Sequence, residues 1–463
     1  MSEIHTENKM GIMPVGKLLI SMAVPMMISM LVQALYNVVD SMFVAKLSQD
    51  ALTAVSFAFS MQNLMIAIAV GTGVGVNALL SKSLGEKDVK TVNRTAGNAI
   101  FLAGCTYILF LVLGLTVTEM YFDVQVKDPI VSQYGKDYLF IVLTCSFGMV
   151  GQICLERLLT STGKTIYSMA TQIIGAVINI ILDPIMIFGY LGCPALGVRG
   201  AAIATVIGQC VACVAGLIFN LRVNKEIEFS IKHMKPSGSI IRRIYAVGVP
   251  SIVMASISSV MVFGMNKILI GFNKTAVAVF GVYFKLQSFV FMPVFGLNNG
   301  MVPIVAFNYG ARSRERIIKT IKLAMVYSVS IMILGTIVFE AMPQLLLGIF
   351  ESNNPAENAA MVEIGVPALR IIAISFIFAG VSIIMGSTFQ ALGNAVYSLF
   401  VSVARQLVII LPVAYFLSLT GHLDLVWLSF PIAEILSLGL SAIFFKKTLK
   451  LIDFDREILP EKA

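Results

Sequence analysis

Several side chains able to bind a proton or a cation lie inside long apolar segments of the chain. The segment SMAVPMMISMLVQALYNVVDSMFVAKL contains three of them, spaced by four and three residues, so they share one face of a helix. An aspartate at the centre of a membrane helix costs about 2.5–3.5 kcal/mol, so each is a functional-site candidate. Their oxygen atoms suit protons and hard cations such as Na⁺. The six candidates are Gln33, Asn37, Asp40, Asn179, Asp183 and Thr205.

Four of these candidates lie at similar depth in their segments. Asp40 and Asp183 lie six and seven residues before the outer ends of their segments, and Thr205 lies six residues after the start of its own. At 1.5 Å per residue, each is ~9–10 Å below the same surface. Asn179 precedes Asp183 by one helical turn. We therefore predict one cluster for H⁺ or Na⁺, with Gln33, Tyr36 and Asn37 as neighbours, although Asn179 and Thr205 alone could simply hold helices together.

Two prolines lie in the helices that would carry the carboxylates. Pro25 precedes Asp40 within the first segment, and Pro184 directly follows Asp183. Proline removes a backbone hydrogen bond and bends a helix. We predict that Pro25 lets the first helix change its bend when Asp40 is protonated. A kink without function, which is common in membrane helices, is the alternative.

The elements that position these residues are apolar segments long enough to cross a bilayer. The chain has 463 residues, of which 58% are hydrophobic and 13% charged, about half the usual charged fraction of a soluble domain. We predict an all-α integral membrane protein with twelve spans of the ~30 Å hydrocarbon core. They lie near residues 16–45, 52–81, 95–118, 137–160, 166–190, 198–221, 244–271, 276–306, 318–349, 361–391, 396–419 and 425–445.

The basic residues indicate the orientation of these spans. If the N-terminus is cytoplasmic, the inside segments hold 24 of the 33 Lys and Arg residues, among them Arg157 and Arg316, and the outside loops hold six. This asymmetry is the positive-inside pattern, so the net charge of +8 needs no nucleic-acid partner. The polar start MSEIHTENKMGIM does not resemble a cleavable signal peptide. We expect a multi-pass membrane protein with both termini cytoplasmic.

The two halves of the chain are related in sequence. GVGVNALLSKSLGEKD and GLNNGMVPIVAFNYGARSRE align at an offset of 225 residues, which also relates Pro25 to Pro250. STGKTIYS and QALGNAVYS align at an offset of 230. Six spans per half is an even number, so the halves are parallel repeats that can rock about a central cavity. We predict an N-lobe of residues 1–232, which includes a cytoplasmic linker, and a C-lobe of residues 233–463.

The acidic site is not duplicated in the C-lobe. At offsets of 225 or 230, the counterparts of Asp40, Asn179 and Asp183 are apolar. The C-lobe instead carries Lys285 and Gln287, for which an internal ion pair and a substrate contact stay open. Arg405 could snorkel toward the interface, and Glu434 could pair with either cation. The sequence alone does not pair them. The basic and acidic candidates here are Lys285, Arg370, Arg405 and Glu434.

These residues resemble the multidrug and toxic compound extrusion (MATE) family. Similar motifs are the segment NIILDPIMIFGYLGCPALGVRGAAIAT at residues 179–205 and LQSFVFMPVFGLNNGMVPIVAFNYGA at residues 286–311. The resemblance implies two six-helix bundles around a V-shaped cavity and export of organic cations in exchange for H⁺ or Na⁺. It places the ion site at Asp40, Asn179, Asp183 and Thr205, with Pro25 as the bending proline. One branch has acidic residues in its seventh helix; VPSIVMASISSVMVFGM has none, which favours coupling through the N-lobe.

Other function classes fit the sequence less well. A flippase for a lipid-linked precursor, from the same superfamily, is the main alternative, but such proteins need a more cationic cavity. No GxSxG, HExxH or GxxxxGK[ST] motif occurs within the spans, so we expect neither an enzyme nor an ATP-driven pump. Six single cysteines and three histidines in polar stretches give no zinc pattern. We expect no cofactor beyond the coupling ion, small cationic or amphipathic drugs as partners, and function as a monomer.

Overall fold

The computed structural model describes residues 8–350 and 355–453, which form helices joined by short loops. The first half contains α1 (Lys9–Ile12), α2 (Val15–Leu47), α3 (Gln49–Gly85), α4 (Val89–Thr116), α5 (Thr118–Gln125), α6 (Pro129–Thr144), α7 (Phe147–Ser161), α8 (Thr165–Phe188), η1 (Tyr190–Gly192) and α9 (Val198–Val223). The second contains η2 (Ile231–Met234), α10 (Gly238–Leu269), α11 (Lys274–Gly310), α12 (Arg314–Ala341), α13 (Pro343–Gly348), α14 (Pro355–Ala373), α15 (Ser375–Ala391), α16 (Ala395–Val403), the π-helix η3 (Ala404–Ile410), α17 (Leu411–Ser418), α18 (Leu423–Trp427), α19 (Ser429–Leu449) and η4 (Lys450–Ile452).

The predicted all-α membrane architecture is confirmed. Ten helical spans in the described residues are long and apolar enough to cross a bilayer. Two bent pairs, α6 with α7 at 47° and α14 with α15 at 44°, bring the number to twelve when each pair is one span. The predicted spans 137–160 and 361–391 correspond to these bent pairs, and the sequence did not predict their bends. The span 318–349 was wrong at its end, because α12 stops at Ala341 and Pro343 begins α13.

Side-chain hydroxyls accompany both bends. Thr144 Oγ1 donates to Phe140 O at 2.6 Å at the end of α6, and Ser375 Oγ donates to Ile372 O at 2.6 Å at the start of α15. A hydroxyl bonded to the backbone carbonyl of the preceding turn competes with the helical ladder and bends a helix. Hydropathy alone does not register this competition, because both segments remain apolar.

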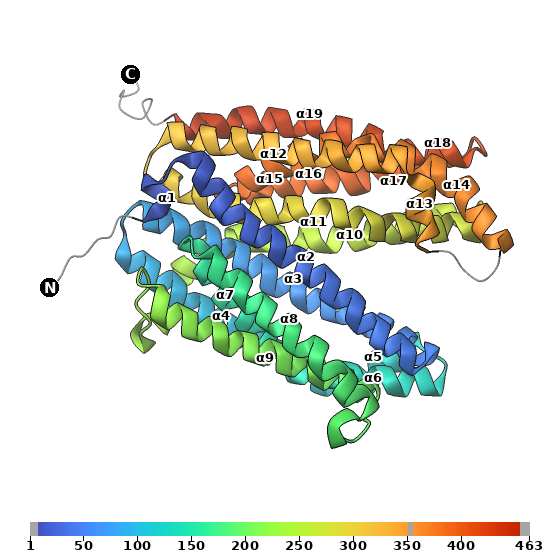
Figure 1. The fold of residues 1–463 in the computed structure, drawn as a ribbon. Coiled ribbons are helices and arrows are strands. Elements are labelled where there is room, and N and C mark those ends of the chain that lie inside the picture. The colour runs from blue at the N-terminus through green and yellow to red at the C-terminus, as the bar shows by residue number, and fades with distance from the viewer. Residues whose placement is uncertain (1–7, 351–354, 454–463) are drawn as a thin grey trace.

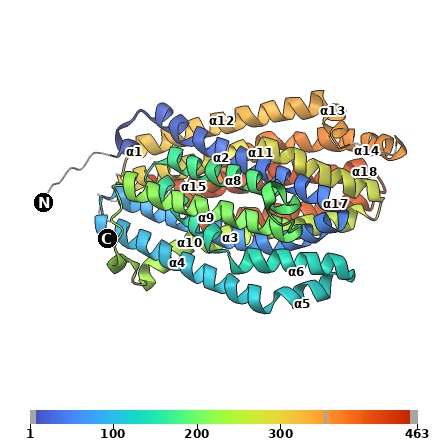
Figure 2. The ribbon, with the colours of Figure 1, turned by 60° about the horizontal axis from the view of Figure 1, so that its bottom comes forward.

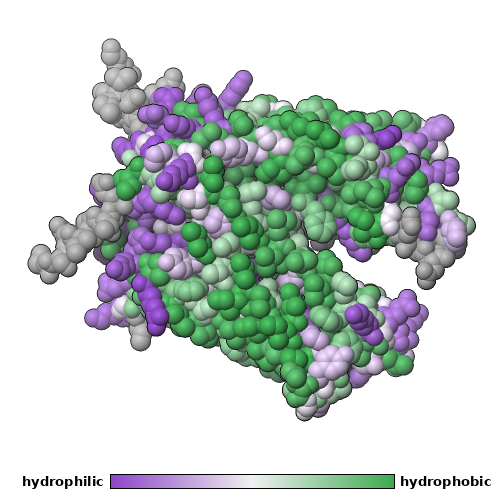
Figure 3. Space-filling model, in the orientation of Figure 1, coloured by the Kyte–Doolittle hydropathy of each residue, from purple (hydrophilic) through white to green (hydrophobic). Residues whose placement is uncertain are grey.

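The helices form two bundles that meet at one end and separate at the other (Figure 1). Helices α2–α9 make up one bundle and α10–α19 the other, and both described chain ends lie where the bundles meet (Figures 1 and 2). The space-filling view shows an open cleft between the bundles at the opposite end (Figure 3). We call the end near Asn8 and Asp453 the closed side. The V-shaped cavity expected of two six-helix bundles is thus present.

The linker between the bundles is fastened to α4. Asn93 Oδ1 accepts from Glu228 N at 2.9 Å, and Asn98 Oδ1 accepts from Ser237 N at 2.9 Å. These contacts continue to Ser237, past the predicted N-lobe boundary at residue 232. The boundary itself stays a prediction.

Glycines bring the two bundles into direct backbone contact. At Gly75 of α3, a Cβ atom would collide with the carbonyl of Ile244 and lie 3.2 Å from Gly248 N, both on α10. At Gly300 of α11, a Cβ atom would lie 2.7 Å from the Cα of Ala23 on α2. Gly75 and Gly300 are 225 residues apart, as are Ala23 and Gly248, so the same contact is built twice. We call these two contacts the glycine seam.

The chain start ties both bundles together on the closed side. Asn8 Nδ2 donates to Thr162 O at 3.0 Å and to Glu226 Oε1 at 3.1 Å in the first bundle. Arg316 of the second bundle donates to the carbonyls of Met10 and Met13 at 2.9 and 2.7 Å. Arg316, predicted to face the inside solution, thus bonds the backbone beside α1.

We predict that Gly75→Ala destabilises the folded protein by about 1–3 kcal/mol, because over-packing forces the two bundles apart. Gly104→Ala in α4 is the matched control, since nothing lies within 4 Å of its added Cβ. Thermal unfolding of both purified variants in one detergent measures the difference. Equal melting temperatures for the two variants would contradict the prediction, because they would show that moving the two bundles apart at Gly75 costs no stability.

Candidate functional site

The structure brings the four predicted ion-site residues together from three helices. Asn179 Nδ2 of α8 donates to Asp183 Oδ1 at 3.4 Å and to Thr205 Oγ1 of α9 at 3.3 Å. With the amide turned over, its nitrogen donates to Asp183 Oδ2 at 3.3 Å instead. The Asp40 carboxyl of α2 lies within hydrogen-bonding reach of Asp183. We call these four residues the acidic cluster.

The acidic cluster is buried and lacks a balancing cation. Asp183 is fully buried, and Asn179 and Thr205 are each 2% exposed. Asp40 is half-buried, and its Oδ1 atom has no hydrogen-bond partner in the described part of the chain. No ion pair of the described residues includes either aspartate. Two adjoining carboxylates without a counter-charge favour the uptake of a proton or a cation.

Tyrosines line the edge of the acidic cluster. Tyr36, a predicted neighbour, lies near both carboxyl groups. Tyr138 of α6 lies within hydrogen-bonding reach of Thr205 and is 2% exposed; the sequence did not single it out. Its signal would have been a lone tyrosine in an apolar segment. Gln33 is half-buried and Asn37 is exposed on the same helix, so α2 presents polar groups beyond the buried cluster.

Both prolines are accommodated inside continuous helices. Pro25 is buried in α2, which runs from Val15 to Leu47, and Pro184 lies in α8. The change of bend at Pro25 therefore stays a prediction. Among the described residues, no group of three His, Cys, Asp or Glu side chains could hold a metal ion, so any Na⁺ site would depend on Asn179 and Thr205 as well.

The polar residues of the second half form separate contacts. Arg405 Nη1 donates to Glu434 Oε1 at 2.7 Å, so Glu434 pairs with Arg405, a pairing that the sequence left open. Lys285 is exposed, and its Nζ lies 5.6 Å from the centre of the Phe350 ring. Lys285 forms no ion pair within residues 8–350 and 355–453, and both of its predicted roles stay predictions. Gln287 is half-buried on the same helix, α11.

Two adjacent charged residues near the end of α7 make contacts inside the protein. Glu156 Oε1 accepts from Gln152 and from Thr171 of α8, at 2.9 and 3.0 Å. Arg157, which we counted among the basic residues at the inner ends of the spans, is 8% exposed and donates to Asn299 Oδ1 of α11 at 3.1 Å. The sequence did not predict that its side chain is buried between the bundles. This bond is a polar link between the two bundles.

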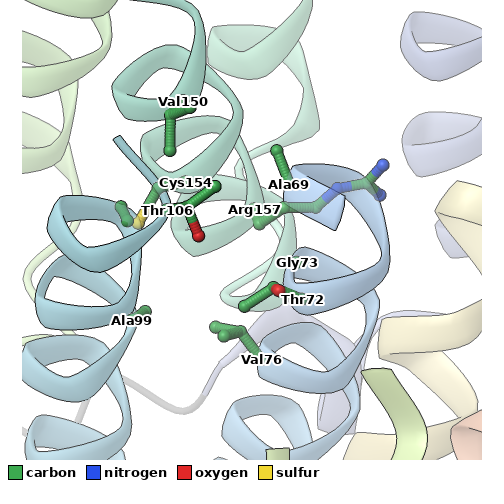
Figure 4. Close-up of a pocket in the computed structure, with 10 residues that line it drawn as sticks. Ala69, Thr72, Gly73, Val76, Ala99, Thr106, Val150, Cys154 and Arg157 are labelled. Carbon is green, nitrogen blue, oxygen red and sulfur yellow. The ribbon is translucent and has the colours of Figure 1, made fainter. Parts of the chain in front are cut away.

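A small cavity adjoins Arg157 in the first bundle. Its volume of about 20 Å³ is enough for one water molecule. The stem of Arg157 passes Gly73 along one wall, and the guanidinium points away from the other lining residues (Figure 4). Thr72 Oγ1 on this wall has no partner among the described residues. The buried guanidinium of Arg157 depends on Asn299 Oδ1 as its hydrogen-bond acceptor.

We predict that Asn299→Leu destabilises the protein by about 1–3 kcal/mol, because it leaves the buried Arg157 guanidinium without its acceptor. The double variant Arg157→Met/Asn299→Leu should recover most of this loss, since it removes both polar groups. Thermal unfolding in detergent measures both. A double variant as unstable as the single one would assign the loss to packing of the new leucine side chain instead of to the unpaired charge.

The chain matches one family model and several curated proteins over most of its length. The MatE family model matches residues 25–185 and 250–416. The multidrug export protein MepA of Staphylococcus haemolyticus is 27% identical over 420 residues, which cover 90% of each chain. The probable multidrug resistance protein NorM of Thermotoga maritima is 25% identical over 449 residues, which cover 95% of this chain and 92% of that protein.

Solved structures share the fold. An outward-facing multidrug resistance MATE family transporter superposes with a TM-score of 0.89 at 21% identity, covering 96% of this chain and 98% of the other. A variant of the MATE transporter VcmN of Vibrio cholerae gives a TM-score of 0.87 at 20% identity, covering 95% and 98%. At these identities the similarity establishes the fold alone.

Proposed function

The chain belongs to the MatE family of membrane transporters, and we propose that it exports organic cations and other xenobiotics by antiport with H⁺ or Na⁺. The observation that supports this most directly is the acidic cluster, whose two carboxylates have no cationic partner among the described residues. The names of the relatives, which specify multidrug export, favour drug-like substrates.

Competition for one negative charge would couple the two fluxes. A proton or Na⁺ bound between Asp40 and Asp183 neutralises the cluster and weakens its attraction for a cationic drug in the cleft. Release of the ion on the opposite side restores the charge and with it the affinity for the drug. Each positive charge that enters the cell in excess of the charge exported gains ~2.3 kcal/mol per 100 mV of membrane potential. A one-for-one exchange with a monocationic drug moves no net charge, so the concentration gradient of the ion alone drives it.

The proposal includes an orientation in the membrane and an assembly state. The chain would lie in the bacterial inner membrane with both termini cytoplasmic, so that the cleft faces outward. It would work as a monomer, because each chain contains its own cluster and cleft, and it would need no cofactor beyond the coupling ion. Gln33, Tyr36 and Asn37 would contact substrate beside the cluster, and Pro25 would bend α2 during the cycle.

We predict that Asp40→Asn lowers ion-driven drug efflux at least tenfold, because it removes one of the two charges for which ion and drug compete. Purified protein in proteoliposomes would export ethidium under an imposed proton gradient or an imposed sodium gradient, tested separately. Asp50→Asn is the matched control, since Asp50 is an exposed carboxylate in the first turn of α3.

Efflux by Asp40→Asn at the wild-type rate would contradict the role of the cluster. A wild-type protein that responds to neither gradient, with several organic cations tried, would contradict antiport itself. Translocation of lipid-linked substrates would then be the next measurement. The gradient that drives efflux identifies the coupling ion.

A further inference from the structure

A lysine of the second bundle lies on the helix face that forms one wall of the cleft. Lys285 and Phe289 are one turn apart on α11, and Gly296 and Gly300 follow seven and eleven residues after Phe289. These spacings put all four residues on one face of the helix. Gly296 and Gly300 are buried against α2, whereas Lys285 and Phe289 are exposed. Because Asn308 of α11 bonds the chain start on the closed side, the exposed part of this face lies toward the open cleft (Figure 3).

Two backbone contacts define the register between α11 and α2. A Cβ atom at Gly300 would lie 2.7 Å from Ala23 Cα, and one at Gly296 would collide with the backbone of Met27. Four residues back along α11 therefore correspond to four residues forward along α2. The two helices are antiparallel, so positions beyond these contacts can be matched in depth by counting residues.

This register places Lys285 at the depth of the acidic cluster. Lys285 lies eleven residues before Gly296, and the position eleven residues after Met27 is Val38. Both positions are about 16 Å beyond the contact at 1.5 Å per residue. Asp40 follows Val38 by two residues, about 3 Å along the axis. An ammonium group and the carboxylates of the cluster thus lie at similar depth in the two bundles.

These opposite charges have no partners in the described part of the chain. Lys285 forms no ion pair there, and neither does Asp40 or Asp183. Asp40 Oδ1 also lacks a hydrogen-bond partner there. Unpaired charges inside a membrane protein are costly and point to a function. A ligand that carries both charges would satisfy the two bundles at once.

Other basic candidates of the second bundle are already paired. Arg405 lies 2.7 Å from Glu434, and Arg370 lies 3.8 Å from Glu340. A carboxylate that approached either arginine would meet the charge of its acidic partner. The ammonium of Lys285 stays available to a ligand in the cleft.

We propose that Lys285 binds the anionic group of a substrate whose cationic group lies at the acidic cluster. The inference rests on the proposed export function and adds zwitterionic amphiphiles to its substrates. The ammonium has three donors on a flexible stem, so it accepts a carboxylate in several orientations. Phe289, which is 55% exposed one turn deeper, offers an apolar surface for the body of the substrate. Without Lys285, the cluster would repel the anionic group and admit only cations.

Two dyes of one skeleton test this charge requirement. Rhodamine 110 carries a free carboxylate, and rhodamine 123 is its methyl ester, which keeps only the positive charge. Fluorescence anisotropy with purified protein in detergent measures the affinity for each dye and needs no ion gradient. We expect Lys285→Met to lower the affinity for rhodamine 110 at least tenfold relative to that for rhodamine 123, because it removes a charged hydrogen bond to the carboxylate.

Three further variants separate charge from structure. Lys285→Arg should keep the wild-type ratio of the two affinities, and Lys285→Glu should favour rhodamine 123 further. Lys274→Met is the matched control, since Lys274 is exposed at the outer end of the same helix, and it should leave the ratio unchanged.

An equal loss of affinity for both dyes in Lys285→Met, an unchanged ratio, or no binding of rhodamine 110 to the wild type up to its solubility limit would each overturn the proposal. Export of rhodamine 123 driven by an ion gradient, together with a ratio unchanged in Lys285→Met, would overturn this inference and leave the antiport standing. A ratio that depends on Lys285 in a protein that exports neither dye under any gradient would contradict the antiport instead.

Discussion

Backbone contact between the two bundles at the glycine seam is the constraint on which the rest of the structure depends. Without a hydrophobic driving force between apolar helices in lipid, close approach at small residues supplies much of their attraction. Here α3 meets α10 and α11 meets α2 at Gly75, Gly248, Gly300 and Ala23. Close contact continues one helical turn further, at Gly71 and Gly296. The bundles separate at the opposite end of the molecule, where the cleft opens (Figure 3). The extent of the close contact therefore limits the depth of the cleft.

The seam and the acidic cluster share a helix. Ala23 lies at the seam, and Asp40 lies seventeen residues further along α2, about 25 Å along the axis. Pro25 falls between them, just beyond the seam. A change of bend at that proline would move Asp40 relative to Asp183 and Thr205, which are held by α8 and α9. The predicted point of bending in α2 thus lies between the close contact at Ala23 and the charge.

Much of this arrangement could be predicted from the sequence, for identifiable reasons. Helical spacing and equal depth were sufficient to bring Asp40, Asn179, Asp183 and Thr205 together. The offset of 225 residues predicted parallel halves, and it also relates Gly75 to Gly300 and Ala23 to Gly248. Hydropathy missed the bends after Thr144 and before Ser375, because both segments remain apolar through the bend. It also did not predict the burial of Arg157, since a buried arginine and a solvated arginine look alike at the end of an apolar segment.

Contacts between distant segments could not be predicted from the sequence. They connect the acidic cluster with the opposite bundle. Thr171 and Asp183 lie on the same helix, α8, and Thr171 donates to Glu156 of α7. The next residue, Arg157, donates to Asn299 across the seam. A shift of α8 on ion binding would thus reach the second bundle through two hydrogen bonds and one peptide unit. A movement that broke the bond to Asn299 would leave the buried guanidinium of Arg157 without this acceptor, so the link resists relative displacement of the two bundles at this point.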